Sequence, residues 1–212
     1  MTYRVAINGY GRIGQSVLRA LIERPDLPLE IVAINELSDL ETIAYLTRYD
    51  TTHGRFPGQV EARDGCLVIN GRTIRVLNAA EPEALPWGEL GIDLLLECSG
   101  SFKDRATAER HLQAGAARLL FSQPAEADVD ATVVYGVNQA AIAPDMRIVS
   151  AASRTARTIL SYPVQRHRLP ASRSRTSCSV GSGFESNSAL VATMNPGVHI
   201  PHCRAAFSRY FC

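Results

Sequence analysis

Short apolar runs alternate with amphipathic stretches over the first 150 residues, a pattern typical of a sheet whose strands are connected by helices. Residues 5–7 predict a parallel strand covered on both faces, and residues 30–36 predict the next one. Between them, apolar side chains recur on one face of a helix over residues 16–23. The N-terminal part of the chain therefore predicts a βαβ unit.

The same alternation continues along the chain. We expect strands at 92–98, 118–122, 130–137 and 146–150, with helices at 39–49, where Asp39 can cap the start, and at 103–114. Asn70-Gly71 lies between two short apolar runs and predicts a β-hairpin, which we expect beside the main sheet. The fold class is therefore α/β, a doubly wound (Rossmann) parallel sheet that forms a dinucleotide-binding domain over residues 1–152.

Three glycines follow the first strand in the pattern Gly9-x-Gly11-x-x-Gly14. The first permits a tight turn, the second lets the backbone approach a pyrophosphate, and the third lets helix and strand pack closely. The helix that follows directs its free N–H groups at the turn, which favours an anion. A motif of this kind is weak alone, but its strand–turn–helix context predicts NAD binding.

Side chains at other strand ends extend this site. Glu36 ends the second strand about 20 residues beyond the glycines, where the fingerprint places a carboxylate for the ribose hydroxyls, and a carboxylate there favours NAD over NADP. An exposed loop carboxylate is the alternative for Glu36. Ser99 and Gly100 form a small-residue turn after the strand at 92–98, and Ser122 ends the strand at 118–122 on the same crevice.

Composition narrows the class of protein. Of the 212 residues, 46% are apolar, which is enough to build a core. The formal net charge of +1 is too small to recruit nucleic acid or a membrane surface. With no signal-like N-terminus and no apolar run of membrane-spanning length, we expect a cytoplasmic protein. The five cysteines have neither zinc spacing nor disulfide density, so we expect free thiols, with Cys98 buried, and no metal site.

The loop at residues 50–56 gathers polar side chains around a glycine. A solvated surface loop and a packed loop bordering the cofactor site are both consistent with that composition.

Several of these stretches together resemble one family. The segments at 6–14, 49–56, 98–102 and 148–150 resemble the phosphorylating glyceraldehyde-3-phosphate dehydrogenases, and those at 33–37, 85–91 and 130–139 are most similar to the branch that oxidises D-erythrose 4-phosphate and feeds pyridoxine (pyridoxal phosphate) biosynthesis. The resemblance implies a sugar-phosphate aldehyde as substrate and a homo-oligomer. It also implies contacts of Arg12 and Ile13 with the pyrophosphate, of Glu36 with the adenosine ribose, of Ser99 and Gly100 along the dinucleotide, and of Ser122 near the nicotinamide ribose.

The resemblance ends at the family's catalytic motif. The position of its nucleophilic cysteine holds Arg154, and Arg157 replaces an asparagine. A guanidinium stays cationic and cannot attack an aldehyde, so we assign no catalytic residue and expect a catalytically deficient chain. A non-enzymatic NAD-binding or interaction protein is the alternative.

Residues 153–212 differ in composition from the first domain. Arginine and serine recur, and Glu185 is the only carboxylate side chain from residue 154 onward. Three interpretations stay open for this atypical Ser/Arg-rich tail: a disordered basic segment, a nucleic-acid-binding arm, and a non-native sequence from a reading-frame shift near codon 154. We favour the frame shift, because the family match stops inside its own motif.

Overall fold

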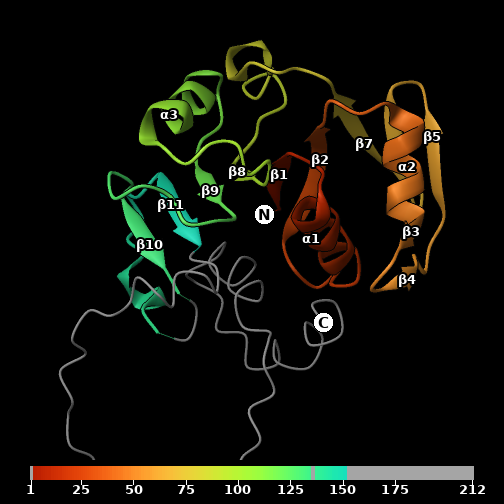
Figure 1. The fold of residues 1–212 in the computed structure, drawn as a ribbon, viewed down its shortest axis with the longest axis horizontal. Coiled ribbons are helices and arrows are strands. Elements are labelled where there is room, and N and C mark those ends of the chain that lie inside the picture. Colours follow the sequence, from red (N-terminus) through yellow and green to blue (C-terminus); the bar gives the residue numbers. More distant parts are fainter. Residues whose placement is uncertain (1, 135–136, 152–212) are drawn as a thin grey trace, which may run out of the picture.

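The computed structural model describes residues 2–134 and 137–151, and these contain one large mixed sheet with helices packed on it (Figure 1). The strands are β1 (Tyr3–Asn8), β2 (Leu29–Asn35), β3 (Tyr49–Asp50), β4 (Gly54–Arg55), β5 (Val60–Arg63), β6 (Cys66–Ile69), β7 (Arg72–Leu77), β8 (Leu94–Glu97), β9 (Leu119–Phe121), β10 (Ala131–Val133) and β11 (Ile148–Ala151). The helices are α1 (Arg12–Ile22), α2 (Leu40–Arg48) and α3 (Arg105–Gln113), with short 3₁₀ turns η1 (Pro82–Ala84) and η2 (Gln139–Ala141).

The sheet has the order β10-β11-β9-β8-β1-β2-β7-β6-β5 and is parallel from β10 to β7. The chain builds outward from β1 to β2 and β7, and then returns to the other side of β1 with β8. Right-handed crossovers therefore place α1 and α2 on one face and α3 on the other. The predicted doubly wound α/β fold is confirmed.

Two apolar clusters fill the faces of the sheet. Val5 and Ile7 of β1 point to the face covered by α1 and α2, whereas Ala6 between them points to the face where Ala108 of α3 and Trp87 pack. The alternation follows from the two-residue period of a strand. It explains why the parallel strands read as continuous apolar runs.

The predicted hairpin continues the main sheet instead of lying beside it. β7 pairs in parallel with β2, and β6 and β5 extend the sheet in antiparallel fashion. Asn70 and Gly71 both have positive φ, as the expected turn requires. β5 was not predicted, although Asp64-Gly65, which also has positive φ at both residues, separates it from β6 in the same way.

The segment at residues 50–56 contains a small hairpin of β3 and β4, in which most residues are exposed and Phe56 is buried. The Asp50 carboxylate accepts hydrogen bonds from the backbone N–H groups of Thr52 and His53, both at 2.7 Å. Arg19 of α1 donates to the carbonyl oxygen of Gly54 and lies over the Phe56 ring. These contacts hold one end of the loop against α1, and its position beside the cofactor site stays a prediction.

Candidate functional site

β1 lies between β2 and β8, at the point where the strand order of the sheet reverses. In doubly wound sheets the crevice outside the carboxyl ends of such strands binds ligands. Backbone hydrogen bonds close the base of this crevice: the Gly9 N–H donates to the Asn35 carbonyl oxygen at 2.9 Å, and the Cys98 N–H donates to the Asn8 carbonyl oxygen at 2.7 Å.

Each of the three glycines in the turn suits its position for a different geometric reason. Gly9 has φ +88°, and a Cβ placed on it would lie 2.4 Å from the Cα of Ser99. A Cβ on Gly14 would lie 2.5 Å from the Gly9 carbonyl oxygen and 3.2 Å from Cγ2 of Ile7, so close helix–strand packing requires glycine there. A Cβ on Gly11 would meet nothing within 4 Å, and the space above it is open to a ligand.

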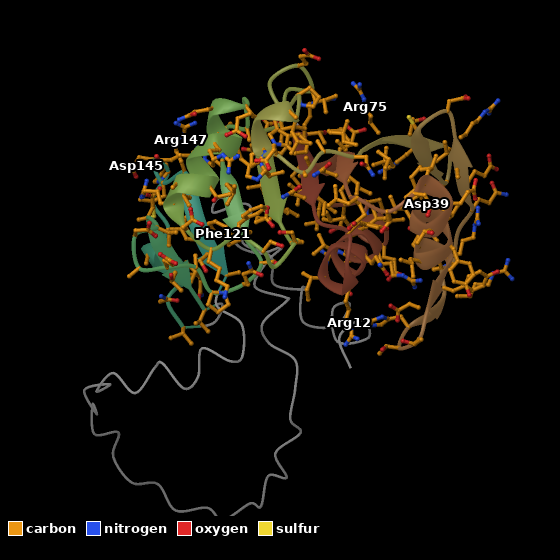
Figure 2. All side chains as sticks on the ribbon, turned by 45° about the horizontal axis from the view of Figure 1, so that its top comes forward. Arg12, Asp39, Arg75, Phe121, Asp145 and Arg147 are labelled. Atoms are coloured by element: carbon orange, nitrogen blue, oxygen red, sulfur yellow. The ribbon has the colours of Figure 1, made fainter. Side chains whose placement is uncertain are left out.

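The N-terminus of α1 has the properties of an anion site. Gly11 is its N-cap, no side chain caps it, and the first turn contains no acidic residue. The first N–H groups of a helix have no partner within the helix, so they remain available to a phosphate. Arg12 is exposed at this end and Ile13 is half-buried. Figure 2 shows the Arg12 side chain at the end of α1, directed away from the helix.

Glu36 lies across the glycine-rich turn. One of its carboxylate oxygens, Oε2, accepts from the Tyr10 N–H at 2.7 Å, and Oε1 accepts from the Leu37 N–H at 2.8 Å. The carboxylate is therefore held beside the turn, unlike a freely solvated loop carboxylate. A carboxylate has about four lone-pair positions, so Oε2 keeps capacity for a ribose hydroxyl.

The turn after β8 borders the same crevice. Ser99 donates its N–H to Glu97 Oε1 at 2.8 Å, and Gly100 has φ +78°. Ser122 follows β9 and donates its N–H to the Glu97 carbonyl oxygen at 2.9 Å. Ser99, Gly100 and Ser122 thus lie at the carboxyl ends of adjacent strands, where we expected them. The contact of each residue with the cofactor stays a prediction.

Sequence reasoning missed a buried polar group beneath this crevice. Asn8, Asn35 and Glu97 are 4%, 6% and 0% exposed and are joined by hydrogen bonds. Their signal in the sequence is that each ends an apolar strand. Burial raises the pKa of Glu97, while hydrogen bonds from Asn8 and Ser99 act in the opposite direction.

His111 of α3 approaches Glu97 from the other side. The His111 Nε2 and Glu97 Oε2 atoms are 3.7 Å apart, and Trp87 Nε1 donates to His111 Nδ1 at 3.2 Å. Burial lowers the pKa of His111 to about 4, so the imidazole is neutral near pH 7. The two side chains are neighbours in the core and not an ion pair at that pH.

The described residues contain two thiols. Cys98 is buried, which raises its pKa to about 12 and makes it unreactive, and Cys66 is a half-buried free thiol. The same residues contain no group of three side chains suited to a metal ion and no helix long and apolar enough to cross a membrane. Arg154, Arg157 and the tail at 153–212 lie outside the described residues.

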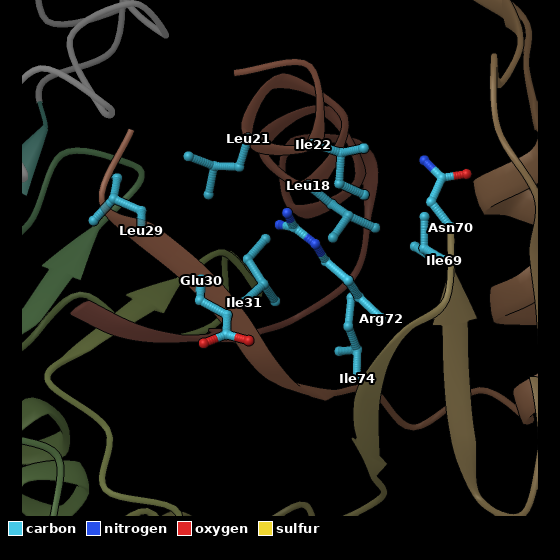
Figure 3. Close-up of a pocket in the computed structure, with 10 residues that line it drawn as sticks. All are labelled: Leu18, Leu21, Ile22, Leu29, Glu30, Ile31, Ile69, Asn70, Arg72 and Ile74. Atoms are coloured by element: carbon cyan, nitrogen blue, oxygen red, sulfur yellow. The ribbon is translucent and has the colours of Figure 1, made fainter. Parts of the chain in front are cut away.

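A half-open pocket of about 190 Å³ lies at the other end of the parallel strands, away from the crevice (Figure 3). Its lining includes Ile22 at the end of α1, Leu29 at the start of β2 and Arg72 at the start of β7. Because it lies at the amino ends of the strands, this pocket is not the dinucleotide crevice.

Comparison with known proteins agrees with the geometry of the crevice. Residues 3–105 match the family model of the glyceraldehyde 3-phosphate dehydrogenase NAD-binding domain. The plasmid and chromosomal glyceraldehyde-3-phosphate dehydrogenases of Cupriavidus necator are each 51% identical over 158 residues, which cover 73% of this chain and 46% of each relative. The chain thus spans about half the length of the curated relatives it matches. It belongs to the glyceraldehyde-3-phosphate dehydrogenase family through its NAD-binding domain, and its cofactor is NAD.

Proposed function

We propose that this chain binds NAD in the crevice beside β1 and does not oxidise aldehyde phosphates. The observation that carries NAD binding is the turn between β1 and α1, where open space above Gly11 meets the uncapped N-terminus of α1. The pyrophosphate would accept hydrogen bonds from the N–H groups of that first turn. The Glu36 carboxylate would accept from the ribose hydroxyls.

The absence of turnover follows from the chemistry of the missing nucleophile. Family members oxidise the aldehyde after a cysteine thiolate has added to its carbonyl carbon, and the corresponding position here is Arg154. Cys98, near the crevice, cannot replace that thiolate, because it is buried and its thiol stays protonated near pH 7. The chain would therefore hold the cofactor without the group that starts the reaction.

The test combines binding and turnover on the purified full chain. Isothermal titration calorimetry measures the affinity for NAD, and NADH absorbance measures turnover with erythrose 4-phosphate and with glyceraldehyde 3-phosphate. Binding without turnover supports the proposal. Turnover would show that another group replaces the thiolate, and loss of both would show that the crevice does not take the cofactor.

The branch of the family is a separate proposal. The segments at 33–37, 85–91 and 130–139 favour D-erythrose 4-phosphate as the ancestral substrate. If turnover is found, a higher kcat/KM for glyceraldehyde 3-phosphate than for erythrose 4-phosphate would contradict this assignment.

A second candidate function is a non-enzymatic NAD-binding protein whose basic tail serves a partner. The charge of residues 154–212 favours it, because arginines recur there and Glu185 is the only carboxylate side chain. The nucleotide sequence offers a direct check. If a shifted frame near codon 154 restores Cys-Thr-Thr-Asn, the tail is accidental and this second function is wrong.

A further inference from the structure

A line of buried polar side chains crosses the carboxyl ends of three neighbouring strands. Asn35 ends β2, Asn8 ends β1 and Glu97 ends β8, and the pairing register aligns Asn8 with both of the others. All three are at most 6% exposed. Burying a polar group costs free energy unless the group is hydrogen-bonded. What this line can do therefore depends on the hydrogen-bond partners of each side-chain atom.

The direction of hydrogen bonding along the line is fixed by backbone at one end. The Ala79 N–H donates to Asn35 Oδ1 at 3.0 Å, and Asn35 Nδ2 donates to the Ala79 carbonyl oxygen at 2.9 Å. These contacts orient the Asn35 amide, because a backbone N–H can only donate. Asn35 Nδ2 also donates to Asn8 Oδ1 at 2.7 Å, which in turn orients Asn8. Asn8 Nδ2 must therefore donate onward.

Glu97 accepts that hydrogen bond and also accepts hydrogen bonds from Ser99, in the turn after β8. Its Oε2 accepts from Asn8 Nδ2 at 2.5 Å, and its Oε1 accepts from both the N–H and the hydroxyl of Ser99. Among the described residues, His111 also faces Glu97, with Nε2 at 3.7 Å from Oε2, and the buried Cys98 thiol interacts with Glu97 electrostatically. Trp87 donates to His111 Nδ1, so the neutral ring carries its proton on Nε2 and offers Glu97 no acceptor. In the described part of the chain, the hydrogen-bonding groups placed against the two Glu97 oxygens are therefore donors.

We propose that Asn35, Asn8 and Glu97 form a hydrogen-bond relay of fixed direction that positions the Ser99–Gly100 turn against Gly9 for NAD. The three are positioning residues, since none is required to touch the cofactor. The proposal rests on NAD binding in this crevice. It also accounts for the carboxylate buried in the core. Asn8 donates to one oxygen of Glu97 and Ser99 donates to the other, so both oxygens must be acceptors.

The direction of the relay suggests a pair of variants that test it. In Glu97→Gln the amide nitrogen of the new side chain faces Asn8 Nδ2 or the Ser99 N–H, so two donors meet. Adding Asn8→Asp restores every bond. The carboxylate introduced on β1 accepts from Asn35 Nδ2 and from the amide nitrogen introduced on β8, while the oxygen of that amide still accepts from Ser99. The double variant keeps the charge of the pair and moves it from one strand to its neighbour.

The first readout is the hydrogen-exchange rate of the Ser99 amide in the full chain without cofactor, measured by NMR. We expect exchange about tenfold faster in Glu97→Gln and a rate within about twofold of the parent in the double variant Asn8→Asp with Glu97→Gln. Equal rates in the parent and the single variant would overturn the relay. If the single variant does not fold, a double variant that folds with a protected Ser99 amide supports the relay, and one that fails in the same way overturns it.

The second readout is NAD affinity by calorimetry at a temperature where each variant is folded. We expect the single variant to bind about tenfold more weakly and the double variant to recover. A side chain needed only for stability would leave the affinity of the folded protein unchanged, so equal affinity overturns the positioning role. If the parent protein does not bind NAD, the proposed function fails, and the Ser99 amide still decides whether the relay exists.

Discussion

Gly9 and Ser99 approach each other so closely that a Cβ on Gly9 would lie 2.4 Å from both the N and the Cα of Ser99. The turn after β1 and the turn after β8 therefore meet backbone to backbone. This contact brings the two predicted halves of the dinucleotide site together, although 90 residues of sequence separate them.

Gly9→Ala tests this contact. The added methyl meets backbone atoms that cannot rotate away, and φ +88° is unfavourable for alanine, so we expect a loss of about 3 kcal/mol or more in the free energy of unfolding, together with loss of NAD binding. Gly54→Ala is the matched control, because Gly54 has φ +71° with nothing within 4 Å and should lose only about 1 kcal/mol. Urea unfolding measures both. Equal losses would show that the backbone contact is unimportant.

Gly11→Ala should separate binding from stability. Gly11 has φ −73°, which suits alanine, and its Cβ would enter open space. We expect the free energy of unfolding to fall by about 1 kcal/mol or less, from the poorer N-cap. NAD affinity should fall at least about tenfold, because the methyl occupies the path of the pyrophosphate. Calorimetry at constant temperature measures the affinity, and an unchanged value would place the pyrophosphate elsewhere.

The sequence was most informative where the physics is local. The spacing of Gly9, Gly11 and Gly14 and the position of Glu36 follow from a strand, a turn and a helix within one βαβ unit, and the structure brings all four together. The hairpin turn at Asn70-Gly71 was predictable for the same reason, since its positive φ values are a property of two adjacent residues. Whether that hairpin continues the sheet depends on pairing with β2, which no local pattern encodes.

Buried polar residues were the least predictable. Arg19 is 2% exposed because its guanidinium donates to the carbonyl oxygens of Thr47 and Gly54, which are 28 and 35 residues away. Glu97 is fully buried, and both of its carboxylate oxygens accept hydrogen bonds, from Ser99 and from Asn8, which lies 89 residues away. Neither the buried state of Arg19 nor the hydrogen-bond partners of Glu97 can be read from the residues next to them in the sequence. Only tertiary contacts provide the partners that offset the cost of burying them.

Glu36→Gln should change the choice between the two nicotinamide cofactors. The carboxylate would accept hydrogen bonds from the ribose and repel the 2′-phosphate of NADP. We expect NAD affinity to fall about tenfold and the ratio of NAD to NADP affinity to move toward NADP. Glu30→Gln is a suitable control, because Glu30 is an exposed carboxylate on β2, the strand that Glu36 follows, and it lies beside the other pocket. Unchanged discrimination in Glu36→Gln would mean that the ribose lies elsewhere.

His111 should make the stability of the domain sensitive to acid. Burial lowers its pKa from 6.5 to about 4 in the folded protein, so the unfolded chain takes up the proton first as the pH falls. The stabilisation is complete above about pH 6.5 and is lost as the pH falls toward 4, a change of about 3 kcal/mol for this difference in pKa.

Glu97 acts in the opposite sense, since its pKa is raised by burial and its protonation favours the folded state. His111→Gln keeps an acceptor for Trp87 Nε1 and removes the titrating group, so its urea midpoint should depend less on pH over this interval. Because Glu97 and the other four histidines, at 53, 167, 199 and 202, are present in both proteins, an identical acid dependence would show that His111 is not the group responsible.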